Sequence, residues 1–181
     1  MSDEAPDITF APVTPDDYPT LRHWLNTPPM NEWWGEPDQA LSHIKDMVEG
    51  RDATRPFIFL VDGEPAGYIQ HWSVSDELDG PHAADAPWLL DLPRDAVGVD
   101  LSIGRPEFLG NGIGTLVLRA FLTRLFTDGI KTVTIDPDES NARAIRCYEK
   151  VGFSFHGRFA HASGVTHLMT ITAKRFAETH S

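Results

Sequence analysis

Cysteine is nearly absent from this sequence of 181 residues, since Cys147 is its only copy. No disulfide can therefore form within the chain, and this favours a reducing compartment. Long apolar runs are missing too: no stretch approaches the roughly 20 residues that a membrane-spanning helix requires. Residues 1–10 lack the basic and apolar segments of a secretory signal peptide. We therefore expect a cytoplasmic protein without a membrane partner.

Basic residues are scarce, with 15 Lys and Arg against 27 Asp and Glu and a net charge of -12. Such a surface repels phosphate backbones, so we expect no nucleic-acid partner. It attracts small cations, which makes a small cationic amine the expected ligand; the simpler alternative is that acidity only keeps the protein soluble. The 8 histidines show no zinc-ligand spacing, and we expect no metal. Whether the protein is a monomer or a homodimer stays open.

The hydrophobic pattern predicts one domain over residues 1–181, in which strands and helices alternate. Strands are predicted at 8–13, 57–61, 66–74, 97–103, 131–135, 153–159 and 165–172, and helices after Thr14, after residue 37, at 113–125 and at 140–151. The order β-α-α-β-β-β-α-β-α-β-β indicates an α/β fold around a mixed sheet. Residues 1–7 are expected to be disordered, and 75–95, rich in Asp, Pro and Ala, to form a long loop.

A glycine-rich turn separates the predicted strand 97–103 from the helix at 113–125. A helix N-terminus presents unpaired N–H groups and a positive dipole end, and glycines let a bound anion approach the backbone closely. A phosphate or pyrophosphate is thus the expected ligand. The P-loop lysine is missing after Gly114, and the spacing of Gly110, Gly112 and Gly114 differs from the dinucleotide-binding pattern G-x-G-x-x-G. A purely structural glycine turn is the alternative.

The segment 108–115 resembles the coenzyme A pyrophosphate loop of the GNAT superfamily of N-acetyltransferases. The segment 136–153 is similar to that family's other cofactor segment, with the pattern Asn-x-x-Ala-x-x-x-Tyr-x-x-x-Gly-Phe from Asn141 to Phe153. The two motifs occur in the family's order and at its spacing. The resemblance narrows to the aminoglycoside 6'-N-acetyltransferases on Trp24-Leu25-Asn26, Glu32-Trp33-Trp34-Gly35, Gly63-Glu64-Pro65-x-Gly67-Tyr68, Gly98-x-Asp100 and the block 143–153.

This resemblance implies a GNAT-type fold and an acyltransferase of the kind that confers antibiotic resistance. Its amine acceptor, the 6'-amino group of an aminoglycoside, would attack the thioester of acetyl-CoA, the co-substrate, directly in a ternary complex. The cofactor-binding residues so implied are Leu101, Ser102, Ile103, Leu109, Gly110, Asn111, Gly112, Ile113, Gly114, Thr115, Asn141 and Arg146. Backbone N–H groups near Leu101 and Ser102 would polarise the acetyl carbonyl. Asn141 could bind pantetheine, cap its helix, or do both.

The resemblance also assigns the chemistry. Tyr148 stands at the family's general-acid position and would protonate the leaving thiolate, unless it is only a buried core residue. Asp100 interrupts an apolar alternation and would either take the ammonium proton or anchor the cation; a plain surface carboxylate is the alternative. Asp136 is expected to contact the acceptor, or else only to occupy a turn before Pro137.

The adjacent Trp33 and Trp34 in a polar loop are expected either to form a wall of the acceptor site or to anchor the loop. Other acceptors suit the same motifs: a lysine- or ornithine-type amine of a siderophore pathway, or a polyamine. A non-catalytic module that binds CoA or the drug is the alternative of another class, and the presence of Tyr148 and Asp100 speaks against it.

Overall fold

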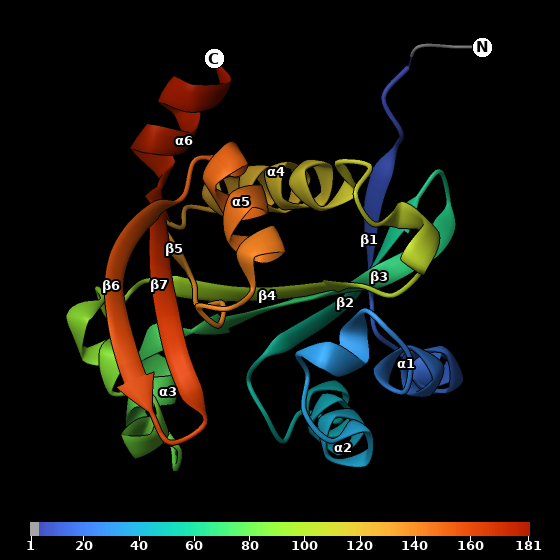
Figure 1. The fold of residues 1–181 in the computed structure, drawn as a ribbon, viewed down its shortest axis with the longest axis horizontal. Coiled ribbons are helices and arrows are strands. Elements are labelled where there is room, and N and C mark those ends of the chain that lie inside the picture. Colours follow the sequence, from blue (N-terminus) through green and yellow to red (C-terminus); the bar gives the residue numbers. More distant parts are fainter. Residues whose placement is uncertain (1–3) are drawn as a thin grey trace. The chain divides into compact units, whose positions relative to one another are not determined.

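The computed structural model of the protein describes residues 4–181 (Figure 1). Its strands are β1 (Ile8–Pro12), β2 (Arg55–Val61), β3 (Glu64–Ser73), β4 (Val97–Ile103), β5 (Thr132–Ile135), β6 (Ser154–His161) and β7 (Gly164–Thr172). They form one seven-stranded sheet in the order β1-β2-β3-β4-β5-β7-β6. β4 pairs with β5 in parallel, whereas β1 and β2, β5 and β7, and β6 and β7 pair antiparallel. The predicted α/β fold around a mixed sheet is confirmed.

Across the described residues 4–181, six α-helices accompany these strands. They are α1 (Tyr18–Leu25), α2 (Pro37–Val48), α3 (Val74–Asp79), α4 (Ile113–Thr127), α5 (Ala142–Val151) and α6 (Ala173–His180). The element order contains the predicted one and adds α3 and α6, which the hydrophobic pattern does not predict. Within residues 4–181, no helix combines the length and the apolar character that crossing a membrane demands.

The chain divides into two compact units. Unit 1 comprises the residues up to Gln70 together with Leu101–Val117, and unit 2 comprises His71–Asp100 together with Leu118–Ser181. The boundaries fall inside β3, β4 and α4, so each of these elements contributes residues to both units. That residues 1–181 act as one acetyltransferase domain stays a prediction.

In unit 1, α1 and α2 lie side by side and bury their apolar faces (Figure 1). The Thr14 N–H donates to the Asp17 carboxylate over 2.8 Å as part of a capping box in front of α1. The buried cluster consists of Val13, Leu21, Trp24, Leu25, Met30, Leu41, Ile44, Ile58 and Tyr68. Burying each large apolar side chain contributes about 1.5–3 kcal/mol relative to leaving it exposed, so this face holds both helices in place.

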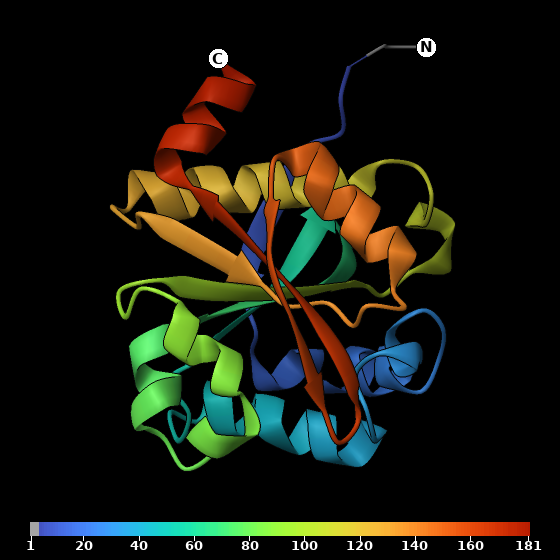
Figure 2. The ribbon, with the colours of Figure 1, turned by 60° about the vertical axis from the view of Figure 1, so that its left-hand side comes forward.

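The segment 75–95 of unit 2 is not the long loop that its composition predicts. It contains most of α3 and two 3-10 turns, Ala83–Asp85 and Pro87–Asp91, which are green in Figure 2. The Ser73 hydroxyl caps α3 by accepting the Asp76 N–H over 3.3 Å. The side chains that bury this segment are Val74, Trp88, Leu89, Leu92, Ala96 and Leu168. The prediction is wrong because a local cap and burial, which composition does not reveal, decide the conformation.

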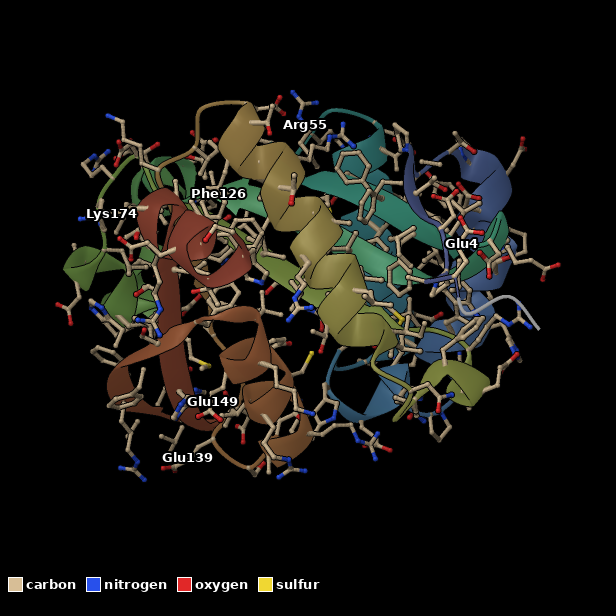
Figure 3. All side chains as sticks on the ribbon, turned by 90° about the horizontal axis from the view of Figure 1, so that it is seen from above. Glu4, Arg55, Phe126, Glu139, Glu149 and Lys174 are labelled. Atoms are coloured by element: carbon tan, nitrogen blue, oxygen red, sulfur yellow. The ribbon has the colours of Figure 1, made fainter. Side chains whose placement is uncertain are left out.

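Unit 2 ends in α6, which packs on α4. The rings of Phe126 and Phe176 have centroids 5.2 Å apart (Figure 3 labels Phe126). The Arg175 Nε donates to the Gly152 carbonyl over 2.6 Å. These contacts hold the C-terminal helix in place although its sequence carries no strong apolar stripe.

The predicted disorder of residues 1–7 falls partly on 1–3, which lie outside the described residues. Where the chain is described, the Asp7 N–H donates to Asp62 Oδ1 and the Asp62 N–H donates to the Asp7 carbonyl, each over 2.9 Å. At Asp7 the chain is therefore tied to the turn between β2 and β3.

Candidate active site

The glycine loop of unit 1 joins β4 to α4. Gly110 and Gly112 have φ angles of 77° and 76°, and a Cβ added at either would meet nothing within 4 Å. Glycine is therefore favoured at both positions by the left-handed backbone conformation, and not by a neighbouring group that a side chain would clash with. The Leu116 N–H donates to the Gly112 carbonyl over 3.1 Å as the helical ladder of α4 begins. In general, the first N–H groups of a helix have no acceptor within that helix. Such N–H groups, at the positive end of a helix dipole, can bind a phosphate.

The end of β4 that enters this loop is held close to β3. The N–H groups of Gly104 and Arg105 both donate to the Ala66 carbonyl, over 2.9 and 3.2 Å. A Cβ added at Gly67 would lie 2.5 Å from the Ser102 carbonyl oxygen, so only glycine allows this approach. The end of β4 that carries the predicted cofactor residues Leu101, Ser102 and Ile103 is therefore firmly placed within unit 1.

The structure places the predicted cofactor residues on two segments. Those from Leu101 to Thr115 follow one another along the end of β4, the loop and the start of α4, all within unit 1. Ile113 is 6% exposed, so it offers a ligand its backbone and not its side chain. Asn141 and Arg146 belong to unit 2, and the Asn141 carboxamide caps α5 by accepting the Ala144 N–H over 3.3 Å. Contact of these residues with a cofactor stays a prediction.

The paired tryptophans of unit 1 differ in their surroundings. Trp34 packs on the buried cluster, edge-on to Tyr68, with ring centroids 5.2 Å apart and an interplanar angle of 87°. Trp33 is 46% exposed. The packing of Trp34 suits the role of a loop anchor, and contact of Trp33 and Trp34 with an acceptor stays a prediction.

Two carboxylates of unit 2 come together through the register of β4 and β5. The two strands pair in parallel at Val97 with Val133 and at Gly98 with Thr134, and Asp100 and Asp136 each follow two residues after the last of these pairs. The two carboxyls interact electrostatically. Burial, followed by the charge of Asp100, raises the pKa of Asp136 from 3.8 to about 8. The pair is thus built to hold a positive charge, either a proton or a bound cation.

Sequence reasoning missed two tryptophans beside this pair. The Trp72 indole N–H donates to Asp100 Oδ2 over 2.8 Å. Trp88 is 8% exposed, and its N–H has no partner of standard hydrogen-bond geometry among residues 4–181. That N–H still acts on the Asp136 carboxyl as a donor that lowers its pKa, whereas the charge of Glu77 raises it. The apolar run that includes Trp88 was visible in the sequence, but its approach to a carboxylate depends on the fold of 75–95.

Tyr148 lies on α5, 7% exposed, with its ring 6.1 Å from that of Phe153. Burial is the main cause that raises the pKa of its phenol, and the charges of Cys147, Asp100 and Asp136 add to it. The phenol therefore keeps its proton at neutral pH. Among the interpretations from the sequence, core packing and proton donation both suit this position.

Sequence comparison assigns the chain to a family: a model described as an acetyltransferase (GNAT) domain matches residues 14–161. The chain belongs to this family. Among the relatives of this GNAT chain is the aminoglycoside N(6')-acetyltransferase type 1 of Klebsiella pneumoniae. The two are 32% identical over 181 residues, which cover 96% of this chain and 87% of the relative.

Solved structures of GNAT enzymes share the fold. The crystal structure of aminoglycoside acetyltransferase AAC(6')-Ib in complex with coenzyme A matches with a TM-score of 0.83 and 31% identity, over 97% of this chain and 100% of that one. The complex of AAC(6')-Ib with coenzyme A and kanamycin matches with a TM-score of 0.82 and 32% identity, over 97% of this chain and 100% of that one. The predicted GNAT identity and the likeness to aminoglycoside 6'-N-acetyltransferases are confirmed.

The residues of this GNAT chain suit the coenzyme of those relatives. The open, left-handed backbone at Gly110 and Gly112 and the helix start behind it offer N–H groups to a pyrophosphate. Within the part of the chain that the structure describes, no three His, Cys, Asp or Glu residues are placed to hold a metal ion.

Proposed function

We propose that this GNAT enzyme transfers an acetyl group from acetyl-CoA to a primary amine of an aminoglycoside, the 6'-amino group. The observation that carries the proposal is the carboxylate pair Asp100 and Asp136, whose charges repel each other just beyond the paired residues of β4 and β5, so that a cation between them would be stabilised. The net charge of -12 and the full-length similarity to N(6')-acetyltransferases support it.

On the cofactor side, acetyl-CoA supplies the reactive thioester. Loop N–H groups at Gly110 to Gly114 would bind its pyrophosphate, and N–H groups near Leu101 and Ser102 would polarise the acetyl carbonyl. In unit 2, Asn141 and Arg146 on α5 remain the predicted cofactor contacts. Because Asn141 already caps α5, its carboxamide is held in one orientation for this task.

On the acceptor side, the amine must lose its proton before it attacks the acetyl carbon. Asp100 accepts that proton, directly or through water, or holds the cation while solvent removes it. Asp136 binds a further positive group of the acceptor, and the exposed Trp33 offers a face for a sugar ring. As the N–C bond forms and the C–S bond breaks, the Tyr148 phenol donates its proton to the departing thiolate.

The test is the release of free thiol from acetyl-CoA with kanamycin and tobramycin as acceptors, with the product mapped by NMR to the 6'-nitrogen. Spermidine and a lysine-type hydroxylated amine compete in parallel reactions. We expect kcat/KM to be higher for kanamycin and tobramycin than for spermidine or the lysine-type amine. Efficient use of the polyamine or the lysine-type amine alone would assign the protein to another acceptor class.

Replacement of Tyr148 by Phe separates an enzyme from a non-catalytic binding module. The ring and its packing on Phe153 are kept, and only the phenol proton is lost. We expect kcat to fall by about 10²-fold or more while acetyl-CoA binding, measured by calorimetry, is unchanged. An unaltered kcat in Tyr148→Phe would remove the general-acid role and leave Tyr148 as a core residue.

A further inference from the structure

We propose that Trp72 is a positioning residue for acetyl transfer, whose indole N–H orients the Asp100 carboxylate and keeps it the charged member of the Asp100–Asp136 pair. The catalytic meaning of this inference rests on the proposed function. The arrangement itself rests on geometry within unit 2 and can be tested without any acceptor.

The Trp72 indole donates a hydrogen bond to the Asp100 carboxylate. Trp72 is the penultimate residue of β3, and its Nε1 lies 2.8 Å from Asp100 Oδ2, a short distance for an indole donor to a carboxylate. The Trp72 ring packs on the buried cluster that includes Val74 and Trp88. Because an indole has a single N–H on a rigid ring, a ring fixed by packing offers the carboxylate one direction for this bond.

Gly98, two residues before Asp100, lies against the Trp72 ring. A Cβ added at Gly98 would lie 2.1 Å from both Cε2 and Cζ2 of Trp72, closer than any side chain could tolerate. Residues two apart in a strand share a face, so Gly98 and Asp100 lie on the same side of β4. Gly98 therefore gives the indole room to lie against the strand and to reach the carboxylate. The spacing Gly98-x-Asp100 acquires a physical reason.

Asp100 and Asp136 also interact through their charges, since the charge of Asp100 raises the pKa of Asp136. Two ionised carboxylates that interact in this way repel, so one of them retains a proton. A hydrogen bond to the ionised form stabilises that form, and Trp72 gives such a bond to Asp100. The Trp88 N–H acts on Asp136 without a hydrogen bond of standard geometry. It therefore stabilises ionised Asp136 less than the Trp72 N–H stabilises ionised Asp100.

Glu77 on α3 acts electrostatically on Asp136, and the charges of Asp100 and Asp136 act on Tyr148 on α5. Glu77 opposes the ionisation of Asp136, which reinforces the same division of roles. The buried phenol of Tyr148 stays neutral and does not reverse it. Asp100 is thereby left as the carboxylate that meets the reacting ammonium group, whether as base or as anchor.

The sharpest experiment replaces Trp72 by its benzothiophene analogue, which keeps the shape of the indole and loses only the N–H. We expect kcat/KM for the aminoglycoside to fall roughly 10-fold to 100-fold, the range for a lost hydrogen bond to a charged group. The acid limb of its pH profile should move to higher pH, while KM for acetyl-CoA stays the same. Gly98→Ala keeps the indole N–H but displaces the ring that carries it away from Asp100. This variant should shift the acid limb of the pH profile in the same direction.

Trp24→Phe is the matched control for packing. Trp24 lies on Gly104 as Trp72 lies on Gly98, since a Cβ added at Gly104 would be 2.2 Å from its ring. Trp24→Phe should lower thermal stability and leave the acid limb of the pH profile where it is. A shift of equal size in this control would show that the profile reports general loosening of the fold.

Carbon-13 NMR of the Asp100 and Asp136 carboxyls in the free protein makes the test independent of the acceptor. In the wild-type protein Asp100 should ionise well before Asp136, and in the benzothiophene variant the two should ionise closer together. If the wild-type protein acetylates no aminoglycoside, the proposed function fails while this titration still decides the role of Trp72. Identical carboxyl titrations in the two proteins would overturn the positioning role.

Discussion

At the scale of single residues, Asp136 shows how a side chain can serve binding at a cost in stability. Its pKa of about 8 means that most of these carboxyls carry a proton at pH 7, since burial and the charge of Asp100 both oppose ionisation. A bound ammonium group would take the place of that proton. The same carboxyl that attracts a cation therefore weakens the fold whenever it ionises without one.

The first prediction concerns Asp136→Asn. In the unfolded chain this carboxyl ionises near 3.8, and in the folded protein near 8. Between these values unfolding releases a proton, so the carboxyl makes the free energy of unfolding fall as pH rises from about 4 to about 8. Asn removes this loss. The free energy of unfolding of Asp136→Asn should therefore exceed that of the wild type by on the order of 1–3 kcal/mol at pH 8 and differ little from it at pH 4. Urea unfolding at both pH values measures it.

Asp138→Asn is the control for Asp136→Asn, because the fold lowers the pKa of Asp138 whereas it raises that of Asp136. Hydrogen bonds from the Ser140 hydroxyl and N–H lower the pKa of Asp138, so its contribution is present at neutral pH and is lost as the pH falls. Its replacement should lower stability at pH 7. The interpretation of Asp136 is wrong if Asp136→Asn is no more stable than the wild type at pH 8.

At the scale of elements, the sequence predicts well wherever a local signal decides the structure. Asp62-Gly63 separates β2 from β3, and both residues have positive φ angles, 50° and 81°, as a two-residue hairpin requires. The cap at Thr14 and the buried stripe of α1 are equally local. α3 is too short for a periodic signal, and α6 depends on the contact between Phe126 and Phe176.

The candidate site divides along the same line. The glycine loop and the segment that starts at Asn141 are contiguous in the sequence, and both could be predicted as binding segments. That the charge of Asp100 acts on Asp136 depends on the parallel pairing of β4 with β5, which tertiary packing sets. The bond from Trp72 likewise joins residues 28 positions apart, and nothing in the sequence around either one indicates it.

The second prediction tests the glycine loop as a phosphate-binding element. Gly112→Ala forces a Cβ onto a backbone with a φ of 76°, which costs about 1 kcal/mol and turns the loop N–H groups away from their direction. We expect KM for acetyl-CoA to rise by about 10-fold, with KM for the aminoglycoside little changed. Steady-state kinetics with each substrate varied in turn measures both.

Gly50→Ala supplies the comparison for Gly112→Ala. Gly50 has a φ of 78°, and its added Cβ would likewise meet nothing within 4 Å, but it follows α2 and lies outside the loop. The two variants should lose similar stability, and only Gly112→Ala should weaken acetyl-CoA. An equal rise of KM in both would mean that strain alone, and not the loop, is responsible.

At the scale of the whole molecule, charge separates the two substrates. The chain carries 27 acidic and 15 basic residues, so its field attracts a polycationic aminoglycoside and repels the anionic acetyl-CoA. If the glycine loop binds the pyrophosphate as proposed, its N–H groups and helix dipole act against an unfavourable long-range field. Long-range attraction would serve only the acceptor.

The third prediction follows from this asymmetry. Raising the salt concentration from about 10 mM to about 300 mM shortens the screening length from roughly 30 Å to under 10 Å, which weakens long-range attraction and repulsion alike. Because steering acts on association, kcat/KM for the aminoglycoside should fall by about 3-fold to 10-fold, while kcat/KM for acetyl-CoA should stay level or rise. An acceptor with a single amine should respond less than one with several. A parallel fall for both substrates would point to a general effect of salt on the enzyme, and the acidic surface would then be left with solubility as its role.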